Sequence, residues 1–152
     1  MGIKRLYIAG PLFCEAERSY NRHIRDELAK HGYEALLPQD NSADIPEGPM
    51  PPDEGLEVSR KVFRKDLEML DSCDALVLNL DGRVPDEGAC VELGIAYASG
   101  KRCYGVKTDT RSVELNMDVN PMITGCMIKL FKNYDGSELI AELEDYLSKN
   151  EL

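Results

Sequence analysis

Short apolar runs alternate with longer helical patterns along this chain, and the alternation constrains the fold more than any other feature of its 152 residues. The runs Arg5 to Ala9 and Ala75 to Leu80 are bounded by residues that break regular structure, as expected of strands buried on both faces of a sheet. Further strands are predicted over residues 33–37, 101–107 and 127–132. Strands that alternate with helices require right-handed crossovers, which produce a parallel sheet covered on both faces.

The segments between these strands carry helical patterns. Gly32 stops the first pattern, and apolar residues of the second fall roughly on one stripe, as in an amphipathic helix. We therefore expect a single α/β domain over residues 1–152, a flavodoxin-like three-layer sandwich with a five-stranded parallel sheet and a ligand crevice at the carboxyl ends of the strands. The helical patterns cover residues 15–31, 57–70, 86–99 and 137–148, and the stripe consists of Val58, Val62, Leu67 and Leu70.

Residues 40–55 interrupt this regularity. The segment holds half of the chain's 8 prolines, together with glycines and several acidic residues. A loop of this length inside a compact domain is usually functional or mobile. The sequence is compatible with a loop that covers a substrate, and also with a solvated insertion.

Charge narrows the range of partners. With 28 acidic and 18 basic residues the formal charge is -10, so a nucleic-acid polymer or an anionic membrane surface would be repelled over most of the protein. A neutral or cationic small molecule is the expected ligand. We also expect a soluble, cytoplasmic protein, because the sequence has neither a signal peptide nor an apolar stretch of about 20 residues.

The sequence predicts neither a metal nor a cofactor. His23 and His31 lie on one helix without Cys or acidic residues at zinc-ligand spacing, and the glycine patterns of P-loop and dinucleotide-binding proteins are absent. The odd number of cysteines and the lack of a CxxC pair favour reduced thiols used as small core residues. These cysteines are Cys14, Cys73, Cys90, Cys103 and Cys126.

One carboxylate, that of Glu92, has an unusual setting. At 100° per residue it falls about 60° from Ala89 and about 40° from Ala96, so it borders the core stripe of its helix. Its neighbours one turn away are Gly88 and Ala96, which leave space for a ligand. A partly desolvated glutamate near the positive end of a helix is expected to stay ionised yet reactive, as a nucleophile requires. The spacing is also compatible with a solvated acid at the helix edge.

Several short blocks stand in a fixed order along the chain. They are Tyr7-Ile-Ala-Gly-Pro11, Asp40-Asn41, Lys65-Asp66-Leu67, Pro85-Asp86-Glu-Gly88, Glu92-Leu-Gly94-Ile-Ala96 and Asn120-Pro-Met122. In order and spacing they resemble the nucleoside 2-deoxyribosyltransferases over nearly the whole chain. A single block would be weak support, whereas several in register are specific.

The resemblance implies an enzyme of nucleoside salvage, a pentosyltransferase that moves 2-deoxyribose between nucleobases by double displacement. Glu92 matches the family's nucleophile, which forms a covalent deoxyribosyl ester and gives net retention. Asp66 and Asp86 match the acids that bind the base and protonate its leaving nitrogen. Asp86 is also predicted from its position to cap the helix. Tyr7 matches the tyrosine that holds the nucleophile, although as a residue it is equally an ordinary strand aromatic.

The resemblance also implies substrate contacts. Phe13 matches an aromatic residue beside the base, and it is otherwise a core Phe. Asn120 matches a residue that reaches the sugar 5-hydroxyl in a neighbouring subunit, which implies a homo-oligomer built from dimers, up to a hexamer; alternatively it is a turn residue. The blocks extend the candidate substrate-binding residues to Gly10, Asp40, Asn41, Gly88 and Met122.

Two departures from the family pattern leave base preference open. Ser42 stands where some members have a base-binding Gln, and the chain ends without their aromatic C-terminus. The expected substrates are 2-deoxyribonucleosides and free nucleobases. The alternatives are a hydrolase that cleaves 2-deoxynucleoside 5-monophosphates and a non-catalytic nucleotide-binding module on the same fold.

Overall fold

The protein folds around one sheet of five parallel strands. The computed structural model describes residues 4–44, 48–111 and 119–150. Strands β1 (Arg5–Ala9), β2 (Glu34–Leu36), β3 (Ala75–Asn79), β4 (Arg102–Lys107) and β5 (Lys129–Lys132) lie in the order β2-β1-β3-β4-β5. This order and the exclusively parallel pairing confirm the predicted flavodoxin-like fold.

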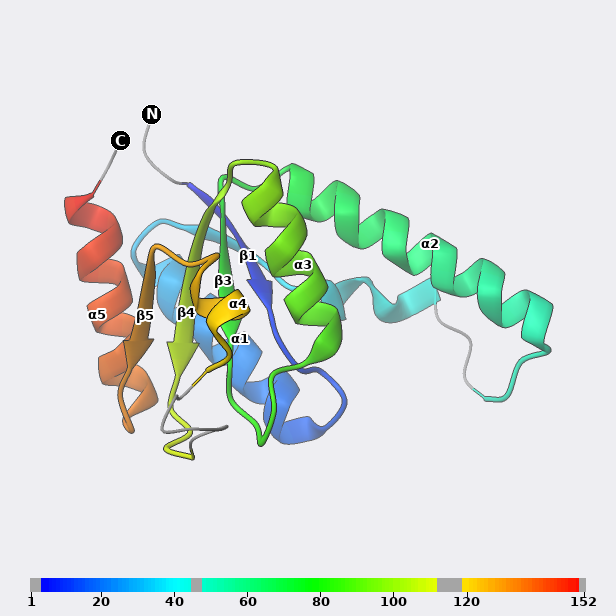
Figure 1. The fold of residues 1–152 in the computed structure, drawn as a ribbon, viewed down its shortest axis with the longest axis horizontal. Coiled ribbons are helices and arrows are strands. Elements are labelled where there is room, and N and C mark those ends of the chain that lie inside the picture. The colour runs from blue at the N-terminus through cyan, green and yellow to red at the C-terminus, as the bar shows by residue number, and fades with distance from the viewer. Residues whose placement is uncertain (1–3, 45–47, 112–118, 151–152) are drawn as a thin grey trace.

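Helices cover both faces of the sheet (Figure 1). One face packs against α1 (Glu15–Lys30) and α5 (Gly136–Lys149), with Ile24 and Leu143 in its core. The other face packs against α3 (Glu87–Ala98) and the C-terminal end of α2 (Pro52–Asp71), with Leu70 and Leu93 among its buried residues. The central strands β1 and β3 are therefore buried from both sides, as their apolar sequences predict.

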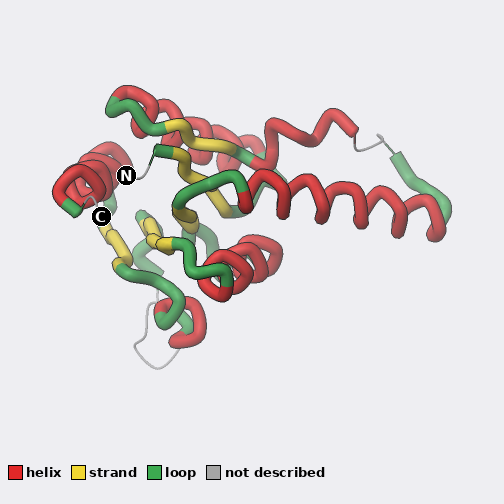
Figure 2. Tube along the Cα trace, turned by 90° about the horizontal axis from the view of Figure 1, so that it is seen from above, coloured by secondary structure: helices red, strands yellow, loops and turns green. Residues whose placement is uncertain are grey.

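The second predicted helix is longer than the sequence analysis indicated. The expected start is residue 57, but α2 begins at Pro52, the last residue of the cluster that holds half of the chain's prolines. Proline is favoured in the first turn of a helix, and Asp53 and Glu54 add negative charge at the positive end. The N-terminal part of α2 projects well beyond the sheet (Figures 1 and 2).

The expected loop over residues 40–55 is correspondingly shorter. Its first part belongs to a 3-10 helix, η1 (Pro38–Asp44), and its last part belongs to α2. Residues 45–47 lie outside the described ranges. The prolines thus mark a helix start as much as a loop, which a count of prolines does not distinguish.

Smaller differences occur near the carboxyl-terminal end. A short helix, α4 (Pro121–Thr124), precedes β5 and was not predicted. Its four residues are too few for a periodic pattern. No helix of the described part of the chain combines the length and the apolar character needed to cross a membrane.

Candidate active site

The N-terminal turn of α3 fixes the position of Glu92. Asp86 is the N-cap, as predicted, and its Oδ2 accepts a hydrogen bond from the backbone N–H of Ala89 at 2.8 Å. This bond satisfies one of the donors that every helix start leaves without a partner. Ala89, Leu93 and Ala96 are buried against the sheet, so the rotation of α3 is fixed and Glu92 is directed beside that buried stripe.

Glu92 is hydrogen-bonded to the first strand. The hydroxyl of Tyr7 donates to Glu92 Oε1 at 2.7 Å, across 85 positions of sequence. Tyr7 of β1 is itself 0% exposed, and the core residues packed around it hold its ring in place on the α3 side of the sheet. Short bonds to a charged acceptor are among the stronger hydrogen bonds in proteins. The pairing therefore fixes one carboxylate oxygen, and the described residues make no hydrogen bond to the other, which can face a ligand.

Burial raises the pKa of Glu92 to about 7. The Tyr7 hydrogen bond acts in the opposite direction, while the negative charges of Asp66 and Asp86 raise the pKa further. The sequence analysis expected a glutamate that stays ionised near the helix start. In the structure Glu92 lies in the middle of α3, too far along for the helix N-terminus to offset the cost of burial. At neutral pH it therefore exchanges between its charged and neutral forms.

Tyr7 and Asp66 share the same electrostatic setting. Burial and the neighbouring Glu92 raise the pKa of Tyr7 well above its usual range, so it remains a hydrogen-bond donor. Asp66 is half-buried on α2, and burial raises its pKa as well. An acid of this kind holds a proton more readily than an exposed aspartate and can deliver it to a substrate atom.

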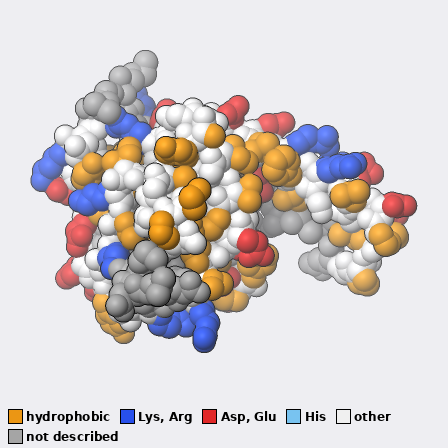
Figure 3. Space-filling model, viewed as in Figure 1, with side chains coloured by type: hydrophobic (Ala, Val, Ile, Leu, Met, Phe, Trp, Pro, Cys, Tyr) orange, Lys and Arg blue, Asp and Glu red, His pale blue; other side chains and the backbone are white. Residues whose placement is uncertain are grey.

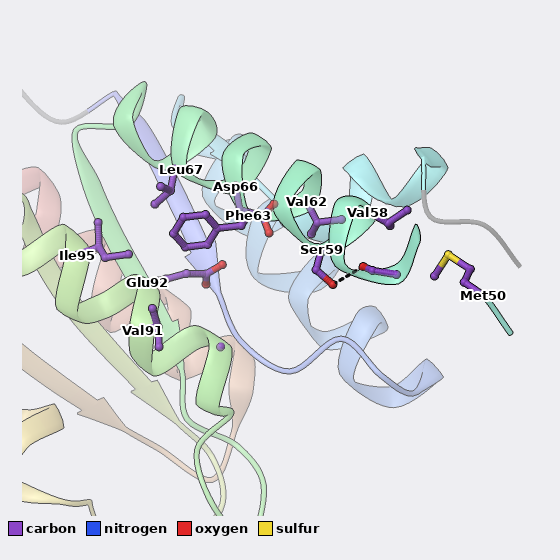
Figure 4. A pocket seen from close by; sticks show the side chains of 12 residues that line it. Met50, Val58, Ser59, Val62, Phe63, Asp66, Leu67, Val91, Glu92 and Ile95 are labelled. Atoms are coloured by element: carbon purple, nitrogen blue, oxygen red, sulfur yellow. Dashed lines mark hydrogen bonds between the residues drawn. The ribbon is translucent and has the colours of Figure 1, made fainter. Parts of the chain in front are cut away.

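A cavity of about 510 Å³ lies between α2 and α3. Figure 4 shows Asp66 on α2 and Glu92 on α3, both directed into the space between the two helices, with the ring of Phe63 beside them. Most of the wall is apolar, which suits a flat aromatic ligand with a few polar groups. The lining residues are Met50, Gly55, Val58, Ser59, Val62, Phe63, Asp66, Leu67, Gly88, Val91, Glu92 and Ile95.

The sequence analysis did not identify most of the residues that line this cavity as part of a site. The predicted stripe of α2 contributes Val58, Val62 and Leu67, which line the cavity, whereas only Leu70 is fully buried. A helical stripe does not reveal whether it faces a core or a cavity. Phe63, next to Val62, also lines the cavity and is 53% exposed. The signal that the sequence offered was an additional apolar residue on this helix beyond the four residues of the stripe.

Six of the seven predicted binding residues do not line this cavity, among them Phe13, Asn120 and Met122, which have exposed side chains. Phe13 is 76% exposed, and its backbone N–H donates to Glu17. Asn120 is exposed and caps α4 by accepting from the Met122 N–H at 2.9 Å, while the Met122 side chain is 80% exposed. The described part of the chain therefore leaves all three accessible to a neighbouring molecule.

The other predicted binding residues have different surroundings. Asp40 in η1 forms an ion pair with Arg25 of α1 at 3.1 Å, and Asn41 is exposed in the same turn. Gly10 directly follows β1, and a Cβ there would lie 2.8 Å from Asn79 Cβ. Gly88 lines the cavity, and a Cβ there would lie 3.2 Å from Asp86 Oδ2, so its lack of a side chain keeps the space beside the cap open.

The cysteines and metal-binding residue types form no second candidate site. All five cysteines are free thiols, of which Cys73 and Cys103 are buried and Cys14 is exposed. Burial raises the pKa of Cys103 to about 11 and makes it unreactive. Within residues 4–44, 48–111 and 119–150, no group of three or more His, Cys, Asp or Glu side chains is arranged to hold a metal ion.

The sequence model of a family described as nucleoside 2-deoxyribosyltransferase matches residues 6–136. An uncharacterized protein of Schizosaccharomyces pombe is 37% identical over 111 aligned positions, and the match covers 70% of this chain. The match spans about half, 51%, of the yeast protein.

Solved structures share the fold. A conserved protein from Enterococcus faecalis V583 superposes with a TM-score of 0.75 at 22% identity, covering 97% of this chain and 99% of the other. A 2-deoxyribosyltransferase from the psychrotolerant bacterium Bacillus psychrosaccharolyticus superposes with a TM-score of 0.73 at 23% identity, covering 93% and 91% of the two chains. At these identities the similarity is one of fold.

Proposed function

Because this chain belongs to the nucleoside 2-deoxyribosyltransferase family, we propose that it exchanges the nucleobase of 2-deoxyribonucleosides by double displacement at Glu92. The observation that carries the proposal is the buried Glu92 carboxylate, held by Tyr7 and facing a cavity that it shares with Asp66. The biological use of such a reaction is nucleoside salvage.

In the first half-reaction, the free oxygen of Glu92 attacks the anomeric carbon of the sugar. The bond from that carbon to the base nitrogen breaks, and its electron pair leaves with the base. Protonated Asp66 supplies the proton that neutralises the leaving nitrogen, with Asp86 as a second acid on the base side. The product is a deoxyribosyl ester of Glu92, formed through an oxocarbenium-like transition state.

In the second half-reaction, a nitrogen of another base attacks the same carbon. The ester bond breaks and returns its electron pair to the Glu92 carboxylate, while Asp66 takes back a proton from the incoming base. Two inversions give net retention at the anomeric carbon. The same residues act in both directions, as microscopic reversibility requires.

The raised pKa of Glu92 supports its use as a nucleophile. Its charge is disfavoured by burial and by the negative charges of Asp66 and Asp86, and ester formation removes that charge. A carboxylate with a pKa of about 7 is also a stronger base than an ordinary glutamate, while a substantial fraction is still ionised at neutral pH.

The cavity favours a neutral substrate. Among the described residues that line it, none is Lys or Arg, and both ionisable groups are carboxylic acids. A phosphate group would therefore meet negative charge without a compensating cation. These features favour 2-deoxyribonucleosides and free bases over 2-deoxynucleoside 5-monophosphates.

We further propose that the active protein is a homo-oligomer in which Asn120 reaches a neighbouring site. Helix α3 is predominantly apolar, with Glu87 and Glu92 as its charged residues, and Val91 and Tyr97 on its outer face are each 57% exposed. Figure 3 shows hydrophobic side chains scattered over this face of the molecule. A second copy seated there would cover these residues.

Incubation with thymidine and adenine tests the proposed reaction. The expected result is deoxyadenosine together with thymine, detected by chromatography. Release of thymine without deoxyadenosine would indicate hydrolysis, and thymidine that stays bound but chemically unchanged would indicate a binding module. Either of these results would contradict the proposed transferase.

A further inference from the structure

Two buried side-chain amides are hydrogen-bonded to each other at the carboxyl end of the sheet. Asn21 of α1 and Asn79 at the end of β3 are 3% and 1% exposed. The amide Nδ2 of Asn79 donates to Asn21 Oδ1 at 3.0 Å, across 58 positions of sequence. Buried amides are costly unless they are hydrogen-bonded, and the proposed chemistry uses neither residue. Their bonds therefore point to another use.

Asn21 also contacts the segments that leave two other strands. Its Nδ2 donates to the backbone oxygen of Pro11 at 2.8 Å and to Gln39 Oε1 at 3.1 Å. With the bond from Asn79, both N–H groups and the oxygen of this amide have partners. Pro11 follows β1, Gln39 follows β2, and Asn79 ends β3. One side chain thus joins three parallel strands at or just beyond their carboxyl ends. We call the segments that follow the strands the strand exits.

The connection continues to a fourth strand. The backbone N–H of Asp81 donates to Asn79 Oδ1 at 3.0 Å. The carboxylate of Asp81 accepts from the backbone N–H groups of Thr108 at 2.7 Å and Asp109 at 2.8 Å, which follow β4. We call Asn21, Gln39, Asn79 and Asp81 the polar strap.

The surroundings of Gly10 independently show that the polar strap is tightly packed against the backbone that follows β1. A Cβ atom built at this position would lie 2.8 Å from Asn79 Cβ and 3.4 Å from Asn21 Oδ1. The first distance is shorter than real Cβ contacts, so any side chain here would displace the Asn21–Asn79 pair. Glycine at the end of β1 is thus required by the strap.

We propose that the polar strap positions the segments that follow β1, β2, β3 and β4, and thereby orients the substrate-binding residues in these segments. Ligands of open parallel sheets bind outside the carboxyl ends of the strands, where these exits lie. Pro11 leads to Phe13, Gln39 leads to Asp40 and Asn41, and Asp81 leads to the cap of α3. The proposal rests on the proposed function, and the strap residues act through these segments without contacting the reacting atoms.

The test compares Asn21→Ala with Leu28→Ala, a variant of the same helix that removes a fully buried side chain distant from the strap. In Asn21→Ala we expect faster hydrogen exchange over 10–14, 38–41 and 80–86, together with a tenfold or larger rise in KM for the nucleoside. The pH midpoint of kcat/KM should stay unchanged, because the Tyr7–Glu92 pair is not part of the strap. Leu28→Ala should lower Tm, while KM stays within twofold of wild type.

Asp81→Ala is a second test variant, with a smaller expected effect on hydrogen exchange. It removes only the connection to β4, so exchange should rise over 107–111 while 10–14 and 38–41 stay protected. Two results would overturn the proposal. One is hydrogen exchange that is equally fast at all strand exits in Leu28→Ala, and the other is an unchanged KM in Asn21→Ala despite faster exchange at these exits. If the wild-type protein transfers no base, the proposed function fails, and the exchange pattern alone then decides whether the strap exists.

Discussion

The two sides of the proposed site differ in how completely one chain builds them. On the catalytic side, Tyr7 is fully buried, Glu92 is bonded to it, and Asp66 faces the same cavity. On the other side, Phe13 and Met122 are among the most exposed large hydrophobic residues of the described chain. The groups proposed for the chemistry are thus positioned by the core, whereas Phe13 and Met122, proposed to hold the substrate, lie exposed on the surface of the single chain.

The difference has a physical origin. A carboxylate whose pKa is to be raised must be desolvated, and only core packing provides that. Residues that hold a substrate are not subject to this requirement, and they can be supplied by loops or by another subunit.

Glu92→Gln should have the largest effect, a loss of about a thousandfold or more in base exchange, because an amide cannot form the sugar ester. The rate of deoxyadenosine formation from thymidine and adenine measures it. Glu87→Gln is the matched control, since it removes an exposed acid from the first turn of the same helix. Substantial exchange by Glu92→Gln would exclude Glu92 as the nucleophile.

Tyr7→Phe should lower kcat/KM by about ten- to a hundredfold, the usual effect of losing a hydrogen bond to a charged group. It should also change the pH profile. In wild type, kcat/KM should rise with pH to a midpoint of about 7 as Glu92 ionises. The Tyr7 hydroxyl lowers the pKa of Glu92, so its removal should move that midpoint upward. A midpoint that stays in place would mean that the bond is not made in the active enzyme.

Asn120→Ser should lower kcat/KM by about three- to tenfold, because serine retains the helix cap but is too short to reach a neighbouring site. Mixing this variant with Glu92→Gln should restore activity above the average of the two, since a mixed oligomer contains sites with an intact Glu92 and an intact Asn120. Mixing Glu92→Gln with Tyr7→Phe is the control, because both residues come from one chain. Lack of restoration in the first mixture would contradict a shared site.

The smallest expected effect is on stability. Between pH 4.5 and about 7 the folded protein binds more protons at Glu92 than the unfolded chain does, so stability falls as pH rises through this range. Glu92→Gln does not titrate, and it should therefore gain on wild type by about 1 kcal/mol, or about 3 °C in Tm, between pH 5 and pH 8. Thermal unfolding at both pH values measures the gain. An identical difference in Tm at the two values would show that Glu92 has an ordinary pKa.

The order of strands and helices was accessible from sequence because it depends on local periodicity. Residues 6–9 and 75–78 form two apolar runs, as expected of strands in a sheet that is buried on both faces. The start of α2 at Pro52 was not accessible, because the same prolines suit both a loop and the first turn of a helix.

The site was accessible in part. The setting of Glu92 follows from helical spacing, and the position of Asp86 follows from the capping rule. The contact between Tyr7 and Glu92 and the apolar wall from α2 depend on how distant elements pack, which no local pattern specifies. The polar strap is of the same kind, because its members are ordinary polar residues until the strand exits bring them together.

The most direct test of the central claim is to trap the ester. The protein is mixed with a 2-deoxyribonucleoside without an acceptor base, quenched in acid, and digested for peptide mass spectrometry. The account predicts a deoxyribosyl adduct on the peptide that contains Glu92, and its disappearance when adenine is added before the quench. Complete base exchange with no adduct on Glu92, or with the adduct on another residue, would contradict it.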